Sequence, residues 1–191
     1  MKTVSMVLIA LTLMAGLADG SAAAKLSLSA QSRQVLVDPE NARDRRTLVY
    51  FELPDELRSP EAFIDFATLN IRAGIDGAAA GTIEAYPVTS DWRSGVDVAW
   101  DAPWSTPGGD YAAGDRTSRY TLKSASGSRD LSIDVTDIVR DWTSGTLENR
   151  GLIIKLSDSD LDAQRAECDV SQVDVRLEIL YSVGQEKMQR E

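Results

Sequence analysis

Three aspartates at alternate positions have the residue type and spacing that could hold a metal ion. Asp158, Asp160 and Asp162 follow an apolar segment, and carboxylates spaced in this way can converge on Ca²⁺, which takes about six to eight oxygen ligands. An EF-hand loop needs glycine at its sixth position, where this chain has Ala163. We therefore expect either a structural calcium site of another kind at the three aspartates or a solvated acidic turn.

A second group of residues could recognise a sugar. Trp104 and Tyr111 lie in the Pro- and Gly-rich stretch 101–115, and Arg116 and Arg119 follow it. Flat aromatic rings have apolar faces that can stack on sugar rings, and a forked guanidinium can bind carboxylates or hydroxyls. We expect these four side chains to form a polysaccharide-binding site on a loop. The alternative is that Trp104 folds back over the edge of a sheet.

The composition excludes much catalytic chemistry. The chain has no His and one Cys, which rules out a Ser-His-Asp triad, a His-ligated zinc and an intrachain disulfide. Its 20 basic and 30 acidic residues give a net charge of −10, which argues against a nucleic-acid partner because phosphates are bound by clustered Lys and Arg. We expect a protein that is not an enzyme, and a small polysaccharide lyase or hydrolase is the least favoured alternative.

The N-terminus has the features of a Sec-type signal peptide. Lys2 precedes an apolar run over residues 4–18, and small residues in an A-x-A pattern end at Ala24. We expect residues 1–24 to be removed by cleavage after Ala24, and an alternative cut follows Gly20. The apolar run is shorter than the ~20 residues of a spanning helix. The sequence thus predicts a secreted or periplasmic protein without a membrane span once the signal is removed.

Most of the remaining chain alternates apolar and polar residues, which is typical of half-buried strands. The alternation predicts strands at 67–73, 96–100, 131–135 and 173–179, and further strands at 48–53, 82–88, 120–123 and 152–156. Many strands with no helices between them favour an all-β fold, an antiparallel β-sandwich. The predicted inward-facing side chains are Leu69, Ile71, Val98, Ile133, Ile154, Val175, Leu177 and Trp142.

One segment has a helical period instead. Val135, Ile138, Val139 and Trp142 lie on one face of a short helix. Asp134 or Thr136 could cap its start, and a glycine at position 145 is typical of a helix end. The spacing predicts one short helix over residues 136–143.

The ordered motifs resemble those of a known family. They are Asp91-Trp-Arg-Ser-Gly95, Val98-Ala-Trp100, Ile133-Asp-Val-Thr136, Val139-Arg-Asp-Trp142 and Asn149-Arg-Gly-Leu152, between an opening segment at 46–54 and a final strand at 175–181. This series resembles the DNRLRE domain, also grouped as carbohydrate-binding module family 96 and related to disaggregatase-type modules. The resemblance implies a secreted, jelly-roll-like sandwich that is often attached to polysaccharide-degrading enzymes or cell-surface proteins. The chain departs from the family in its short opening segment.

These observations predict a domain organisation and a function. After the signal peptide we expect a lead-in segment at 25–45, the sandwich at 46–183 and a polar tail at 184–191. We expect an extracellular, non-catalytic polysaccharide-binding protein, with a partner enzyme or envelope protein chain as a further partner. The alternative is a structural or adhesive subunit of an envelope or matrix, in which an unpaired strand within Leu26–Val37 supplies the contact.

Overall fold

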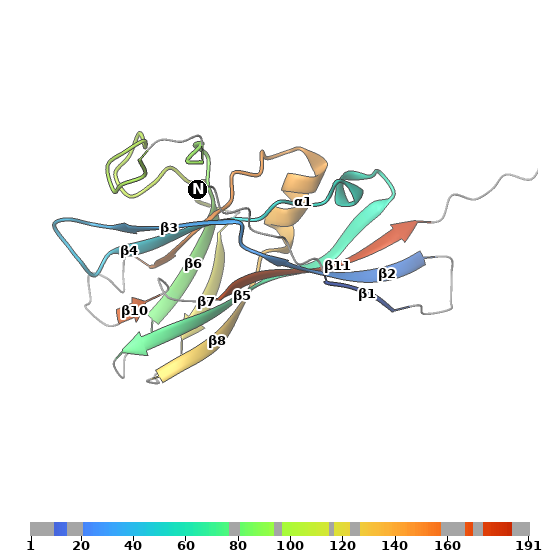
Figure 1. Ribbon diagram of the computed structural model, residues 1–191, viewed down its shortest axis with the longest axis horizontal. Coiled ribbons are helices and arrows are strands. Elements are labelled where there is room, and N and C mark those ends of the chain that lie inside the picture. The colour runs from blue at the N-terminus through green and yellow to red at the C-terminus, as the bar shows by residue number, and fades with distance from the viewer. Residues whose placement is uncertain are drawn as a thin grey trace, which may run out of the picture.

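The chain folds into two antiparallel β-sheets that face each other, with one short α-helix (Figure 1). The structure is a computed structural model, and it describes residues 10–14, 21–76, 81–93, 97–114, 117–122, 127–157, 167–169 and 174–184. The all-β sandwich predicted from the alternating segments is confirmed. No helix within these described ranges is long and apolar enough to cross a membrane.

The first sheet, sheet A, contains the longest strands. Its strands are β1 (Ala10–Met14), β2 (Ser21–Ser29), β5 (Ala62–Asp76), β8 (Gly127–Asp134), β10 (Glu167–Asp169) and β11 (Val175–Gly184). The order is β1-β2-β11-β5-β10, and β8 also pairs with β5. Strands β5 and β11, which are far apart in the sequence, therefore form the centre of this sheet.

The second sheet, sheet B, has the order β3-β4-β9-β6-β7. Its strands are β3 (Ser32–Val37), β4 (Arg45–Tyr50), β6 (Gly81–Pro87), β7 (Ser118–Leu122) and β9 (Leu152–Leu156). Because β2 and β3 are both paired, Leu26–Val37 does not supply the unpaired strand that the structural-subunit alternative expected. Residues 25–37 instead connect the two sheets.

The main core lies between the sheets and follows the predicted alternation. On β11, Leu177 and Ile179 are fully buried, while Arg176 and Leu180 are exposed. The predicted inward positions on the strands are confirmed, as is the burial of Trp142. Val98 is the exception, because it is only half-buried and lies in a second cluster outside the sandwich.

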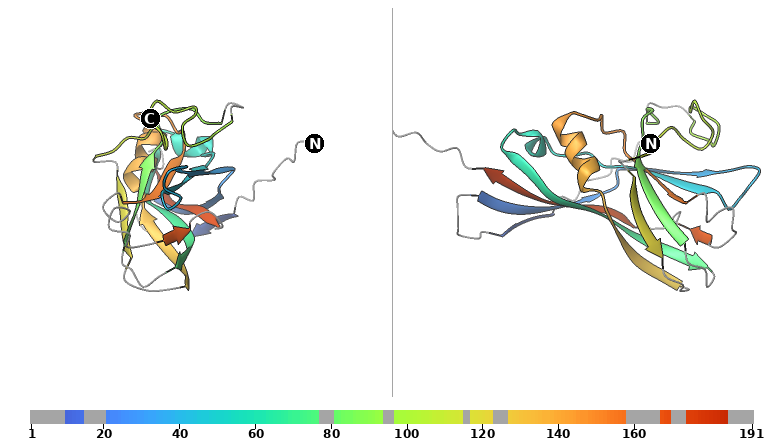
Figure 2. Two further views of the ribbon diagram at one scale, coloured as in Figure 1. Left: turned by 90° about the vertical axis from the view of Figure 1, so that its left-hand side faces the viewer. Right: turned by 180° about the vertical axis from the view of Figure 1, so that it is seen from behind.

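Helix α1 (Thr136–Ser144) and the 3₁₀ helix η1 (Asp55–Arg58) cover the end of sheet A that extends beyond sheet B (Figures 1 and 2). The predicted helix is confirmed with one more residue at its end. Asp134 accepts hydrogen bonds from the backbone N–H and the hydroxyl of Thr136, and Gly145 ends the helix with a φ of 75°. The apolar face of α1 thus completes the main core at this end.

Candidate functional site

The outer face of sheet B is covered by the long loop between β6 and β7. A second apolar cluster lies there, separate from the main core. Its buried members are Leu36, Leu48, Tyr86, Val88, Trp92, Trp104 and Ile153. The loop backbone approaches the sheet so closely at Gly109, which has a φ of +105°, that a Cβ atom there would lie 2.9 Å from Ile153 Cδ1. This face is therefore closed to a large ligand.

Trp104 is part of this cover. It is only 8% exposed, and its indole N–H donates to the carbonyl of Ala99 over 2.8 Å. Trp104 therefore does not form the exposed platform that we expected. Its ring folds back on the sheet, as in the alternative interpretation. The physical reason is that the outer positions of sheet B, such as Leu48 and Ile153, are apolar and need a cover.

Tyr111 lies at the edge of the same cluster. It is half-buried, its ring centroid is 4.7 Å from that of Tyr86, and its hydroxyl lies 3.5 Å from Nζ of the buried Lys155. Tyr111 therefore packs against the sheet and does not project from it. Because the Trp104 ring is buried, Tyr111 and Trp104 do not form an exposed platform for a sugar.

Asp110 fixes the shape of the covering loop. Its carboxylate accepts hydrogen bonds from Ser90, from the backbone N–H and hydroxyl of Ser105, and from the backbone N–H of Thr106. Burial alone would raise the pKa of Asp110, but these hydrogen bonds outweigh burial and lower it to about 2. The ionised form is thus the one that stabilises the loop.

We expect the loop to weaken in acid because of Asp110. A carboxyl group whose pKa falls on folding stabilises the protein above its unfolded pKa, and that contribution is lost as the pH falls from about 4 to about 2. Asp110→Asn should therefore lower the free energy of unfolding by about 1 kcal/mol at pH 7, since solvent screens this partly exposed carboxylate, and by much less at pH 2. Urea unfolding at both pH values measures this, and an equal loss at both would contradict it.

Arg119 is the one predicted site residue that remains accessible among those the structure describes. Its Nε donates to Glu84 Oε1 over 2.9 Å, and its side chain is 63% exposed. Glu84 also accepts the hydroxyl of Tyr86 at 2.6 Å. Burial and this hydrogen bond raise the pKa of Tyr86. Its phenol therefore stays protonated and acts as a hydrogen-bond donor to Glu84.

The remaining predicted site residues lie outside the described residues. These are Arg116 and the aspartates Asp158, Asp160 and Asp162. Within the described part of the chain, no group of three or more acidic or Cys side chains is placed to hold a metal ion. The calcium site therefore stays a prediction.

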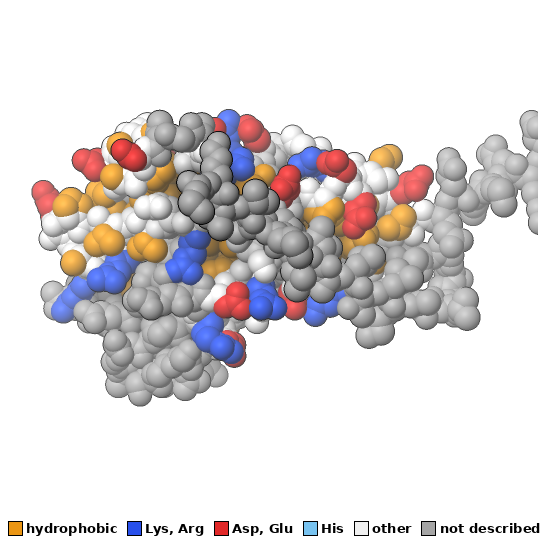
Figure 3. All heavy atoms as spheres, viewed as in Figure 1, with side chains coloured by type: hydrophobic (Ala, Val, Ile, Leu, Met, Phe, Trp, Pro, Cys, Tyr) orange, Lys and Arg blue, Asp and Glu red, His pale blue; other side chains and the backbone are white. Residues whose placement is uncertain are grey.

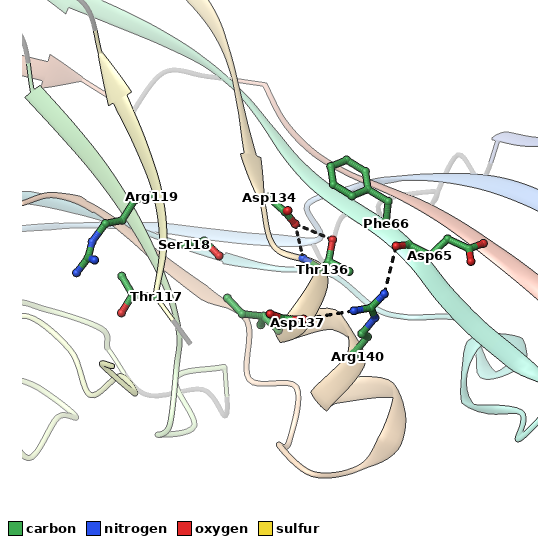
Figure 4. A pocket seen from close by; sticks show the side chains of 10 residues that line it. Asp65, Phe66, Thr117, Ser118, Arg119, Asp134, Thr136, Asp137 and Arg140 are labelled. Atoms are coloured by element: carbon green, nitrogen blue, oxygen red, sulfur yellow. Dashed lines mark hydrogen bonds and ion pairs between the residues drawn. The ribbon is translucent and has the colours of Figure 1, made fainter. Parts of the chain in front are cut away.

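A cleft of about 410 Å³ lies beside Arg119, where β8 ends and α1 begins. Figure 4 shows Arg119 from β7 on one side of it, Asp134 at the end of β8, Asp137 at the start of α1, and Phe66 from β5. Arg140 forms part of the wall. Its guanidinium donates to the carbonyls of Ile64 and Asp65, which precede Thr68, the first residue of β5 that pairs with β8.

The cleft opens onto the outer face of sheet A, which carries a set of hydrogen-bonding side chains that we call the polar face. It is formed by Ser27, Ser29, Thr68, Asn70, Arg72, Asp130, Ser132, Asp134, Arg176 and Glu178. Each alternates along its strand with a buried core residue and so points to the outside. Sequence alternation identifies these positions, but it cannot tell which outer face remains uncovered.

Register aligns the polar face in rows. One row across β2, β11, β5 and β8 is Ser29, Arg176, Asn70 and Ser132, and the next is Ser27, Glu178, Thr68 and Asp134. Neighbouring strands lie about 4.8 Å apart, so each row spans about 14 Å from the first strand to the fourth. The rows are long enough to contact an extended molecule at several points.

Basic side chains on and beside this face form ion pairs with nearby carboxylates. Lys25 pairs with Glu178 at 3.1 Å, Arg72 with Asp130 at 2.8 Å and Arg176 with Asp174 at 3.0 Å. The pair with Arg72 lowers the pKa of Asp130. Figure 3 shows neighbouring side chains of opposite charge in the lower middle of the view. A hollow of about 510 Å³ lies among these pairs, beside Asn70.

An apolar patch ends the polar face next to the cleft. Phe66 and Leu180 are direct cross-strand neighbours and are 48% and 42% exposed. Phe66 also lines the cleft. Phe66 was not among the predicted site residues. It directly precedes the alternating segment 67–73, so assigning the inward-facing residues of that strand would have placed Phe66 on the outward face. The site thus combines one exposed ring with many hydrogen-bonding groups.

These features define an antiparallel two-sheet β-sandwich in which the described residues cover the outer face of sheet B and leave the outer face of sheet A uncovered. Comparison with protein-family models finds no match, and neither does a search of curated proteins. The sequence motifs and the geometry of the polar face are therefore the features that bear on function.

Proposed function

We propose that the protein is a secreted, non-catalytic polysaccharide-binding protein whose ligand lies along the polar face, with one sugar ring stacked on Phe66. The observation that carries this proposal is the arrangement of donors and acceptors in register across four strands that no described residue covers, next to an exposed aromatic ring. Binding sites of this kind combine apolar surface with a few oriented polar groups. The resemblance to the DNRLRE domain, with its expected jelly-roll-like fold, supports the same function.

The ligand that best fits this face is a neutral polysaccharide. Lys25, Arg72 and Arg176 each already have a carboxylate partner on or beside the polar face. A polymer of uronic acids or sulfated sugars would have to displace these carboxylates, and it would also meet the net charge of −10. Sugar hydroxyls, in contrast, can both donate to the carboxylates and accept from the guanidinium groups without separating the pairs.

The direct test is binding of a panel of neutral and acidic polysaccharides to the wild-type protein and two matched variants. Phe66→Ala should weaken binding about tenfold, or about 1.4 kcal/mol, because it removes the stacking ring. Phe63→Ala is the control, since Phe63 also lies on β5, is even more exposed than Phe66 and borders a different cleft. Isothermal titration calorimetry measures both affinities.

Two further observations complete this test. Affinity for a neutral polymer should change by less than about twofold between low and high salt, because no net charge is neutralised. Incubation with the polymer should release neither reducing ends nor unsaturated products. Binding that is confined to acidic polymers and falls steeply with salt would contradict the neutral ligand, and release of products would contradict a non-catalytic role. Binding to no polysaccharide would favour the structural-subunit alternative.

A further inference from the structure

The first residues of β2 are an integral part of sheet A. Ser21–Ala24 continue the strand and pair antiparallel with Tyr181–Gly184 of β11. Ala24 is 5% exposed and belongs to the main core. The paired end of β11 is in turn fixed to η1, because the hydroxyl of Tyr181 donates to Glu56 Oε1 over 3.0 Å.

Strand β1, which precedes β2, takes no part in the pairing of β2 with β11. Among the described residues, strand β1 pairs only with β2, along the edge of β2 that faces away from β11. It lies entirely within the apolar run at 4–18 that is expected to form the signal peptide. Removal of β1 therefore leaves every contact between β2 and β11 in place.

The two cleavage positions that the sequence allows have unequal structural consequences. A cut after Ala24 removes the part of β2 that pairs with Tyr181–Gly184 and takes a buried side chain out of the core. The backbone groups of this end of β11 would then lose their partners on one side and form an open sheet edge next to the buried Tyr181. A cut after Gly20 leaves β2 complete.

We infer that the signal peptide ends at Gly20, so that the mature chain begins with Ser21, the first residue of β2. A signal peptidase would hydrolyse the Gly20–Ser21 peptide bond, with water supplying the hydroxyl of the new carboxyl group on Gly20 and the proton of the new amine on Ser21. Ala18 and Gly20 supply the small residues that the peptidase requires before the cut. This inference depends on export of the chain and is independent of polysaccharide binding.

The first experiment is expression of the full chain in a bacterial host with Sec export, followed by N-terminal sequencing and intact mass of the exported protein. We expect Ser21 as the first residue. A chain that begins at Lys25, or one that retains Met1, would overturn the inference.

Two single substitutions distinguish the cleavage positions. Gly20→Leu places a large residue directly before the proposed cut and should abolish processing to Ser21. Ala22→Leu is the matched control, since it disturbs only the small-residue pattern that precedes a cut after Ala24, and its product should still begin at Ser21. The reverse pattern of processing would overturn the inference.

A stability comparison tests the structural reason. Chains that start at Ser21 and at Lys25, each produced without a signal peptide, should differ in melting temperature by about 5 °C, with the longer chain more stable. Equal melting temperatures would show that sheet A does not need residues 21–24 and would overturn the argument from β2.

Discussion

Replacement of Trp104 with alanine is expected to lower the free energy of unfolding by about 3 kcal/mol and to leave the affinity for a polysaccharide unchanged. The stability effect follows from the burial of the ring and from its hydrogen bond to Ala99. The value lies at the lower end of the range for a lost tryptophan, because a loop can partly close the space that is left. The affinity should not change, because Trp104 lies over sheet B and the polar face lies on sheet A.

Trp100→Ala is the matched control for this prediction. Trp100 lies in the same loop but is only half-buried, with the guanidinium of Arg46 4.5 Å from its ring centroid. It should cost less than half as much stability. Urea unfolding measures both variants, and calorimetric titration measures their affinities. A stable Trp104→Ala protein that no longer binds sugar would restore the loop platform and contradict the proposed face.

Leu177→Ala is expected to destabilise the fold by about 2–5 kcal/mol, the range for truncation of a large core side chain. Leu177 is fully buried, and its direct neighbours across the sheet, Leu28 and Leu69, are also in the main core. The chain supplies its own control in Leu180, which lies on the same strand, faces outward and is 42% exposed. Leu180→Ala should cost less than about 0.5 kcal/mol. Equal losses for the two variants would mean that the phase of β11 is wrong.

The alternation of residue types was sufficient to predict most of the fold. It identified the core side of β5, β8 and β11, because a strand with one buried and one exposed face must alternate. The helix over 136–143 was equally clear, since both its apolar spacing and its final glycine were present in the sequence. These signals are local, and local signals can be read from a single sequence.

The segment at 96–100 was predicted as a strand, but its described residues, 97–100, do not form one. It alternates because Val98 and Trp100 pack against the second cluster while their neighbours face solvent. An irregular loop that covers a sheet can thus have the same pattern as a strand. For the same reason Trp104 was placed wrongly among exposed residues, because nothing in its immediate sequence reveals that the outer face of sheet B is apolar.

The candidate site depends on information that is not local. Asn70, Arg176 and Ser132 come from three distant parts of the chain and become neighbours only through the register of β5, β11 and β8. Phe66 belongs to the site because β8 ends before it and leaves its ring uncovered. Alternation along each strand predicts which side chains face outward, but it does not reveal which of them become neighbours.

The uncovered face of sheet A also makes the protein a natural scaffold for engineering. Side chains such as Asn70 and Ser132 point away from both cores, so their identity is separated from the requirements of folding. Backbone pairing of β5 with β8 places the two residues side by side, and the hydrogen bond from Ser132 Oγ to Asn70 Oδ1 at 2.8 Å lies outside the core. A library that varies only these outward positions could therefore change the recognised ligand while the fold is retained.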